Sequence, residues 1–319
     1  MIGIGRRALV ALALVAAALA APGLPALAQD AQPSRIVFVT HGQAADHYWS
    51  VVKKGVDDAA ATLKVKAEYF APETFDVARM AELMDAAIAS KPDGLVVSIP
   101  DPDALSKHVE DAIAAGIPVI VIDSGGVELT KKLGGLLYMG QSEYEAGVLA
   151  GQRVAKLGLT KAACLNHEVG NVSLDDRCAG FAKGLGQEVP VVAGVMDPIE
   201  MKNRVLAHLS AHPNTEFLLG CGVASAEAAL AAVDEAGLAG RMKLGTFDLS
   251  PGILEAVSAG RMEWGIDAQQ YLMGYMPVVM LDLLKRYKVQ PLADYPTGPG
   301  FVTKADAASV VELSEQGIR

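Results

Sequence analysis

The sequence predicts an α/β protein with two lobes, each built around a doubly wound parallel sheet. Short apolar runs alternate along the chain with longer segments of helical period, which is the βαβ succession of parallel sheets covered on both faces. The runs include RIVFVT (35–40), GLVVSI (94–99), PVIVID (118–123), KAACLN (161–166), EFLLGC (216–221) and MKLGTF (242–247). The intervening helical segments include 77–90, 103–116 and 225–237. With 319 residues and a hydrophobic content of 51%, the chain is long enough for two cores.

The first 28 residues have the order of a secretory signal. Arg6 and Arg7 precede an uncharged apolar stretch that ends in Ala26-Leu27-Ala28. A membrane anchor is the alternative, but the stretch is short and contains Pro22 and Pro25. We therefore expect cleavage near Ala28 and export of the mature chain.

The charge of the chain narrows the choice of partners. The formal net charge is −10, and loss of the two signal arginines takes it to −12. Such an acidic chain is not expected to bind nucleic acid or an anionic membrane surface.

Three cysteines, Cys164, Cys178 and Cys221, are an odd number in an exported chain. One disulfide plus one thiol is one interpretation, with Cys164–Cys178 as the favoured pair, and three free thiols is the other. There is no CxxC motif.

The residues that follow each apolar run are the candidates for ligand binding, because ligands of doubly wound sheets bind beyond the carboxyl ends of the strands. Helix capping and solvation also place polar residues there, so no single one is decisive. These residues are His41 to Trp49, Ser98 with Asp101, Asp123 with Ser124, Asn166 to Glu168 with Asn171, Asp197, Cys221 with Gly222, Asp248, and Asp267 with Gln269.

The ordered set of segments resembles the periplasmic sugar-binding proteins of ABC importers, of the ribose-binding type. The segments that carry the resemblance are IVFVTHGQAADHYWSVVKKGVDDAA, KPDGLVVSIPDPDAL, AGIPVIVIDSG, MGQSEYEAG, GNVSLDDRCAGF, LGTFDLSPGILEAV, WGIDAQQYLMGY and PTGPGFVTK, spread over residues 34–305. The resemblance implies a Venus-flytrap fold of the type I periplasmic binding proteins, with three crossovers between the lobes. It also implies an N-terminal lobe of residues 33–138 plus 270–295 and a C-terminal lobe of residues 139–269 plus 296–319.

The resemblance also implies roles for individual residues. Tyr48 and Trp49 occupy the place of rings that stack on the sugar, with Asp46 as a polar neighbour. Asp123 and Asp248 match carboxylates that bind hydroxyls, and Arg177 matches an arginine of the second lobe. Gln269, or Ala268 beside it, matches a glutamine on the hinge side. Ser98, Ser124 and Asn171, at the ends of strands, complete the set of expected ligand-binding residues.

Three positions depart from the ribose-binding pattern. Gly222 stands in place of an asparagine, Pro198 near the place of a phenylalanine, and Ser124 in place of an arginine. A site with different hydroxyl partners discriminates strongly, because unpaired buried polar groups are costly. We therefore expect a ligand other than ribose.

The residue types fit a sugar on physical grounds as well. Carboxylates and a guanidinium pair with hydroxyls, and a flat ring covers the C–H face of the sugar. Five carboxylates, Asp46, Asp101, Asp123, Asp248 and Asp267, against Arg177 predict an acidic cleft and hence a neutral sugar or polyol. Closure around this ligand would then be recognised by an ABC permease of the inner membrane, with the binding protein as a monomer that needs no cofactor.

Other functions remain open at this point. A sensory receptor of the same fold is one. A metal-binding protein using His41, His47, His167 and Glu168 is another, although no HxH or HExxH spacing occurs. An enzyme is not expected, because no GxSxG is present and Ser124 has no assignable histidine partner.

Overall fold

The computed structural model describes residues 32–42 and 46–319. The predicted signal and its cleavage near Ala28 lie outside the described residues, as do residues 43–45 of the first loop. Among the described residues, no helix has the length and apolarity needed to cross a bilayer.

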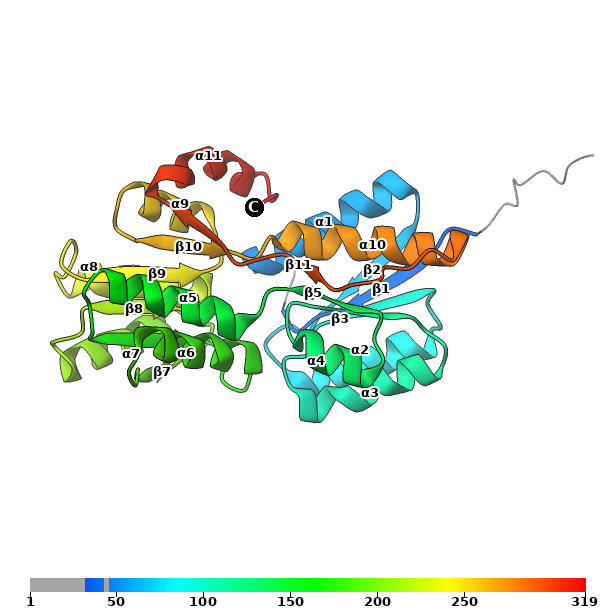
Figure 1. The fold of residues 1–319 in the computed structure, drawn as a ribbon, viewed down its shortest axis with the longest axis horizontal. Coiled ribbons are helices and arrows are strands. Elements are labelled where there is room, and N and C mark those ends of the chain that lie inside the picture. Colours follow the sequence, from blue (N-terminus) through cyan, green and yellow to red (C-terminus); the bar gives the residue numbers. More distant parts are fainter. Residues whose placement is uncertain (1–31, 43–45) are drawn as a thin grey trace, which may run out of the picture. The chain divides into compact units, whose positions relative to one another are not determined.

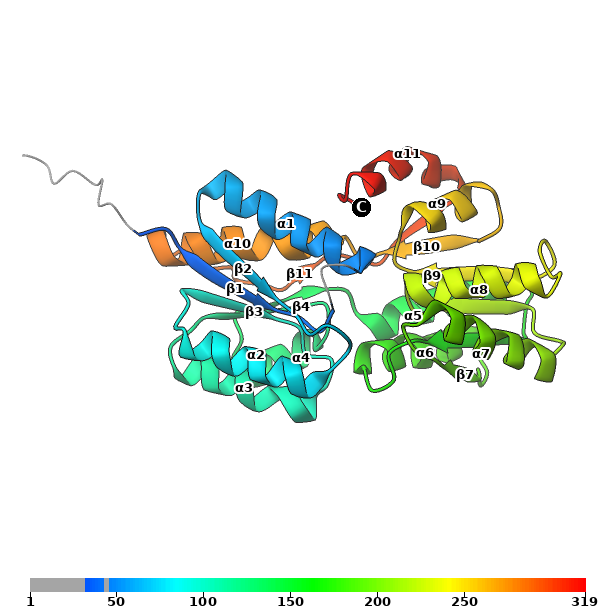
Figure 2. The same ribbon diagram turned by 180° about the vertical axis from the view of Figure 1, so that it is seen from behind.

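The first sheet has six parallel strands in the order β11-β5-β4-β3-β1-β2. Its strands are β1 (Arg35–Val39), β2 (Lys66–Phe70), β3 (Gly94–Val97), β4 (Val119–Ile122), β5 (Leu137–Gly140) and β11 (Tyr295–Pro296). Helices α1 (His47–Leu63) and α10 (Gln270–Tyr287) lie side by side on one face of this sheet, as Figure 1 shows. Figure 2 shows the helices of the other face, α2 (Val77–Ala89), α3 (Pro102–Ala114) and α4 (Gly126–Leu133).

The central strands are apolar throughout because helices cover both of their faces. In β1, Ile36 and Phe38 pack with α1 and α10, whereas Val37 and Val39 pack with α2 and α3, and all four side chains are fully buried. Successive side chains of a strand point to opposite faces, so a strand covered twice has no solvent-facing position for a polar residue.

The second sheet repeats this plan with the order β12-β10-β9-β8-β6-β7, in which only β12 is antiparallel. Its strands are β6 (Ala162–Asn166), β7 (Val191–Ala193), β8 (Phe217–Gly220), β9 (Lys243–Phe247), β10 (Trp264–Asp267) and β12 (Gly300–Thr303). Helices α5 (Glu143–Lys156) and α6 (Val172–Leu185) cover one face. The other face is covered by α7 (Pro198–Ala211), α8 (Val223–Glu235), α9 (Pro251–Ser258) and α11 (Lys304–Glu315).

Glycines allow α5 and α6 to pack backbone against backbone. A Cβ atom on Gly180 would lie 2.0 Å from the carbonyl oxygen of Tyr144, and one on Gly147 would lie 2.4 Å from the carbonyl oxygen of Arg177. A larger residue at either position would push the helices apart. This close approach brings the first turn of α5 next to Arg177 on α6.

The chain passes between the two sheets three times, after β5, after β10 and after β11. The predicted fold class, two doubly wound lobes with three crossovers, is confirmed. We call the elements of the first sheet the first lobe and those of the second sheet the second lobe.

Candidate functional site

Two carboxylates of the site directly follow central strands. Asp123 follows β4 and Asp248 follows β9, and both have left-handed backbone conformations, with φ of 61° and 68°. Non-glycine residues rarely adopt this conformation, although Asp tolerates it better than most residues. Backbone conformations of this kind concentrate at functional sites. Here they occur where the chain leaves a strand and turns towards the next helix, beside the site.

The N-terminus of α1 supplies the aromatic residues. Asp46 caps this helix by accepting a hydrogen bond from the Tyr48 backbone N over 2.7 Å. The Tyr48 hydroxyl donates to Oδ1 of Asp123, and the ring of Trp49 meets His41 edge-on at 4.8 Å between centroids. Both rings are buried, with exposures of 8% and 4%. Tyr48 and Trp49 are therefore part of the core of the first lobe and also form the inner wall of the site.

Arg177 on α6 is the only arginine of the site among the described residues. Its Nε donates to Oε2 of Glu143 over 2.6 Å, and its Nη1 donates to the Cys221 carbonyl oxygen (2.6 Å) and to Oδ2 of Asp248 (3.1 Å). The guanidinium also lies 4.5 Å above the centroid of the Phe247 ring. Arg177 is thus held on three sides, which fixes its orientation before any ligand binds.

Burial dominates the electrostatics of this cluster. It raises the pKa of Asp248 to about 8, against the lowering effect of Arg177, and it raises the pKa of Glu143 for the same reason. The nearby carboxylates Glu143 and Asp248 in turn hold the pKa of Arg177 well above its usual value in spite of desolvation. Oδ1 of Asp248 is buried and has no hydrogen-bond partner among the described residues. A hydroxyl of a ligand would supply that partner.

His41 joins the two lobes at the site. Its Nδ1 lies 2.8 Å from the Ser98 hydroxyl, and its Nε2 lies 3.3 Å from Nδ2 of Asn171, a residue of the second lobe. The same Nε2 is 3.9 Å from Asp123 and 3.8 Å from Glu168. Ser98 and Asn171 therefore orient this ring from opposite lobes.

Seven of the ten expected ligand-binding residues line one pocket, which encloses about 40 Å³ of free space. They are Asp46, Tyr48, Trp49, Asp123, Asn171, Arg177 and Asp248. We call this pocket the polar pocket. His41, His167, Glu168, Cys221 and Gly222 also line it.

The other three expected residues do not line the polar pocket. The Ser98 hydroxyl is hydrogen-bonded to the backbone N and to Nδ1 of His41. The Ser124 hydroxyl donates to Oδ2 of Asp123. Gln269 donates from its Nε2 to the Thr297 carbonyl oxygen at a crossover between the lobes. These side chains support the pocket or the crossover.

The set of carboxylates in the cleft also differs from the expectation. Asp101 caps α3 by accepting from the Ala104 backbone N, and Asp267 accepts from the Gln269 backbone N and pairs with Arg319. Neither lines the polar pocket. Glu168 lines it instead, and Glu143 contacts Arg177. Sequence reasoning missed Glu143, although it follows the apolar run LLYMG (136–140), which could have been interpreted as a strand.

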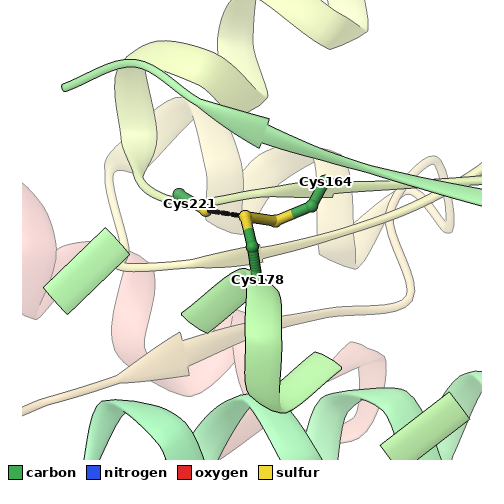
Figure 3. Close-up of side chains that lie close together, drawn as sticks. All are labelled: Cys164, Cys178 and Cys221. Carbon is green, nitrogen blue, oxygen red and sulfur yellow. Dashed lines mark hydrogen bonds between the residues drawn. A yellow bond between two sulfur atoms is a disulfide. The ribbon is translucent and has the colours of Figure 1, made fainter. Parts of the chain in front are cut away.

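The structure pairs Cys164 with Cys178 and leaves Cys221 as a buried free thiol, which is the favoured interpretation of the sequence. Figure 3 shows the three sulfur atoms together, with Sγ of Cys221 at 3.3 Å from each of the other two. Burial raises the pKa of the Cys221 thiol to about 12, so this group stays protonated.

The histidine-based metal site finds no support. In the part of the chain that the structure describes, the only set of three or more metal-ligating side chains close enough to share an ion is the three cysteines. His41, His167 and Glu168 line one pocket without forming such a set.

A polar pocket between the carboxyl ends of two parallel sheets, joined by three crossovers, defines a two-lobed solute-binding protein. The chain belongs to the periplasmic binding protein domain family, whose model matches residues 36–288.

Several relatives have known names or structures. The chain is 27% identical to the xylose/arabinose-binding protein XylF of Sulfolobus acidocaldarius over 85% of this chain and 71% of that protein. It is 27% identical to the D-ribose/D-allose-binding protein of Pseudomonas aeruginosa over 81% of this chain and 84% of that protein. A carbohydrate transporter from Acidothermus cellulolyticus 11B, solved in complex with myo-inositol, is 32% identical with a TM-score of 0.84, over 90% of this chain and all of that one.

Proposed function

We propose that this protein captures a neutral sugar or polyol in the polar pocket and delivers it to an ABC importer. The relatives named above support the ligand class. Two of them are named as binding proteins for xylose and arabinose and for ribose and allose, and the third is solved in complex with myo-inositol. The observation that carries the proposal is the convergence of Tyr48, Asp123, Arg177 and Asp248 on one pocket.

The chemistry of these groups suits hydroxyls. Asp123 accepts hydrogen bonds and Arg177 donates them, and the protein itself leaves Oδ1 of Asp248 unpaired. With its pKa raised to about 8, the Asp248 carboxyl is protonated at neutral pH and can donate to a hydroxyl oxygen. A buried polar atom without a partner costs free energy, which a bound hydroxyl would recover. The excess of carboxylates disfavours phosphorylated or carboxylated ligands.

The mechanism follows from contacts on both lobes. Tyr48 and Asp123 belong to the first lobe, and Arg177 and Asp248 to the second. A ligand that binds all four favours the closed arrangement by the difference between its affinities for the closed and open forms. An inner-membrane permease would recognise the closed form. The protein would act in the periplasm as a monomer, without catalysis.

The lobe boundaries are part of the proposal. We place the first lobe at residues 33–138 plus 270–295 and the second at residues 139–269 plus 296–319. Sheet pairing supports this division closely, with β5 ending at Gly140 and β11 at Pro296, one or two residues past the proposed limits.

A thermal-shift screen tests the function. Pentoses, hexoses, myo-inositol and linear polyols are added in turn to the purified protein, with zinc and EDTA in parallel. A ligand that binds only the folded state raises the melting temperature with concentration. We expect a shift for one sugar or polyol that is lost in Asp123→Asn and kept in Asp57→Asn, a matched carboxylate exposed on α1. A shift with zinc and with no sugar or polyol would refute the proposal.

A further inference from the structure

A second pocket adjoins the polar pocket and has a different lining. Four apolar side chains, Phe75, Val169, Val195 and Met196, contribute to its walls, and it encloses about 620 Å³. We call it the apolar pocket. The polar pocket has only about 40 Å³ of free space, so the greater part of the room beside the carboxylates lies on this apolar side.

The two pockets are neighbours that share part of their lining. His41, Asp46, His167 and Glu168 line both of them. The apolar pocket is therefore the space next to a ring bound in the polar pocket, into which a substituent of that ring would extend. Asp46 and Glu168 line both pockets and Asp197 lines the apolar pocket, whereas the carboxylates Asp123 and Asp248 line only the polar pocket.

Two of the four apolar side chains are exposed. Val169 is 63% exposed and Met196 is 38% exposed. Covering apolar surface is favourable, and burial of about 55 Å² corresponds to about tenfold in affinity. The hydroxyls of a second sugar ring would have to be desolvated against these apolar side chains, whereas an aryl or alkyl group has no hydroxyls of its own to desolvate.

His167, which lines both pockets, has an unpaired ring nitrogen. Its Nδ1 is buried and has no hydrogen-bond partner among the described residues, and burial lowers the pKa of this histidine, which favours the neutral ring. A neutral imidazole can form a hydrogen bond with an ether oxygen of a ligand.

We infer that the protein binds a glycoside whose sugar ring occupies the polar pocket and whose apolar aglycone occupies the apolar pocket. This inference rests on the proposed function and narrows its ligand class from free sugars to sugars that carry an aryl or alkyl group.

Isothermal titration of the full chain with matched ligands tests the inference. The probes are D-glucose, D-galactose and D-xylose, their methyl and phenyl glycosides in both anomers, and cellobiose and lactose as ligands with a second sugar ring. We expect one phenyl glycoside to bind about tenfold more tightly than its methyl counterpart. In the double variant Val169→Ser/Met196→Ser, this gain in affinity of the phenyl over the methyl glycoside should disappear. The affinity for the methyl glycoside itself should stay the same.

The control variant is Ile199→Ser. Ile199 is 68% exposed near the start of α7 and does not line the apolar pocket, so this variant should retain the whole gain. Equal affinities for phenyl and methyl glycosides would overturn the inference, as would a gain that survives in the double variant or tighter binding of a disaccharide. Binding of free sugars or polyols but of no glycoside would overturn the inference and leave the proposed function standing. Absence of binding by every sugar, polyol and glycoside would overturn both.

Discussion

Nε of Arg177 donates to Oε2 of Glu143 over 2.6 Å, and the two side chains are both nearly fully buried. Glu143 opens α5 and Arg177 lies on α6, so this pair exists because glycines allow the two helices to touch. Because Glu143 binds Nε, Nη1 of Arg177 remains available to donate to Asp248. Glu143 is thus a positioning residue for Arg177 and does not itself line the polar pocket.

Replacing Glu143 should separate positioning from stability. Glu143→Ala leaves the buried Arg177 without its main counter-charge, and we expect ligand affinity to fall at least tenfold together with a stability loss of about 3 kcal/mol. Glu143→Gln keeps an acceptor for Nε, so it should recover most of the affinity. Titration calorimetry and urea unfolding measure the two effects. Equal affinities in both variants would argue against positioning through Nε.

Asp248 should make stability depend on pH. Its pKa is about 8 in the folded protein, well above the value near 3.9 of an unfolded chain, so between these pH values the folded state binds more protons than the unfolded state. The contribution of this group to the free energy of unfolding therefore falls as pH rises from about 4 to 8. Asp248→Asn removes this contribution. Urea unfolding at pH 5, 6.5 and 8 should show the variant gaining stability relative to the wild type as pH rises, and a constant difference would contradict the prediction.

The Tyr48 hydroxyl should matter for binding more than for folding. Tyr48→Phe keeps the buried ring but removes the hydrogen bond to Asp123. We expect ligand affinity to fall about tenfold, because Asp123 loses the hydroxyl that orients its carboxylate in the polar pocket, a hydrogen bond of about 1.5 kcal/mol. Tyr271→Phe is the control, because its hydroxyl bonds Asp58, which does not line either pocket. Equal losses of affinity in the two variants would count against a role for Tyr48.

Gly222 should tolerate no side chain in the polar pocket. A Cβ atom at this position would lie 2.7 Å from the His167 ring and 3.2 Å from Oδ2 of Asp248. We expect Gly222→Ala to fold and to lose at least tenfold in ligand affinity, because His167 and Asp248 must shift. Gly252→Ala, where the nearest atom is at an ordinary 3.4 Å, should bind normally. Calorimetry on both variants checks this, and unchanged binding by Gly222→Ala would show that the pocket adapts.

The disulfide should stabilise the second lobe independently of Cys221. It closes a loop with a sequence separation of 14, for which chain entropy predicts about 3 kcal/mol. Cys164→Ala/Cys178→Ala should lower the free energy of unfolding by about that amount, and Cys221→Ser by less. Thiol titration of the denatured wild type should find one free thiol. Three free thiols would show that the chain carries no disulfide.

The sequence by itself determined the fold class and most of the polar pocket. Strands that helices cover on both faces are apolar throughout, so the alternation of short apolar runs with helical segments is visible in the sequence. Polar side chains follow the end of each such strand. Asp123 and Asp248 were found in this way. Glu143 was not found, because the apolar run that precedes it, LLYMG (136–140), was not interpreted as a strand.

Only the tertiary structure decided which of these polar residues face the pocket. Ser98, Ser124 and Gln269 share the strand-end pattern with Asp123, yet they bond neighbouring groups behind the pocket or at a crossover. The direction of a side chain at a strand end depends on the local backbone turn and on the helices packed around it, and these are set by contacts between distant segments. The shared lining of the polar and apolar pockets has the same origin, because the shared residues come from loops about 120 positions apart in the sequence.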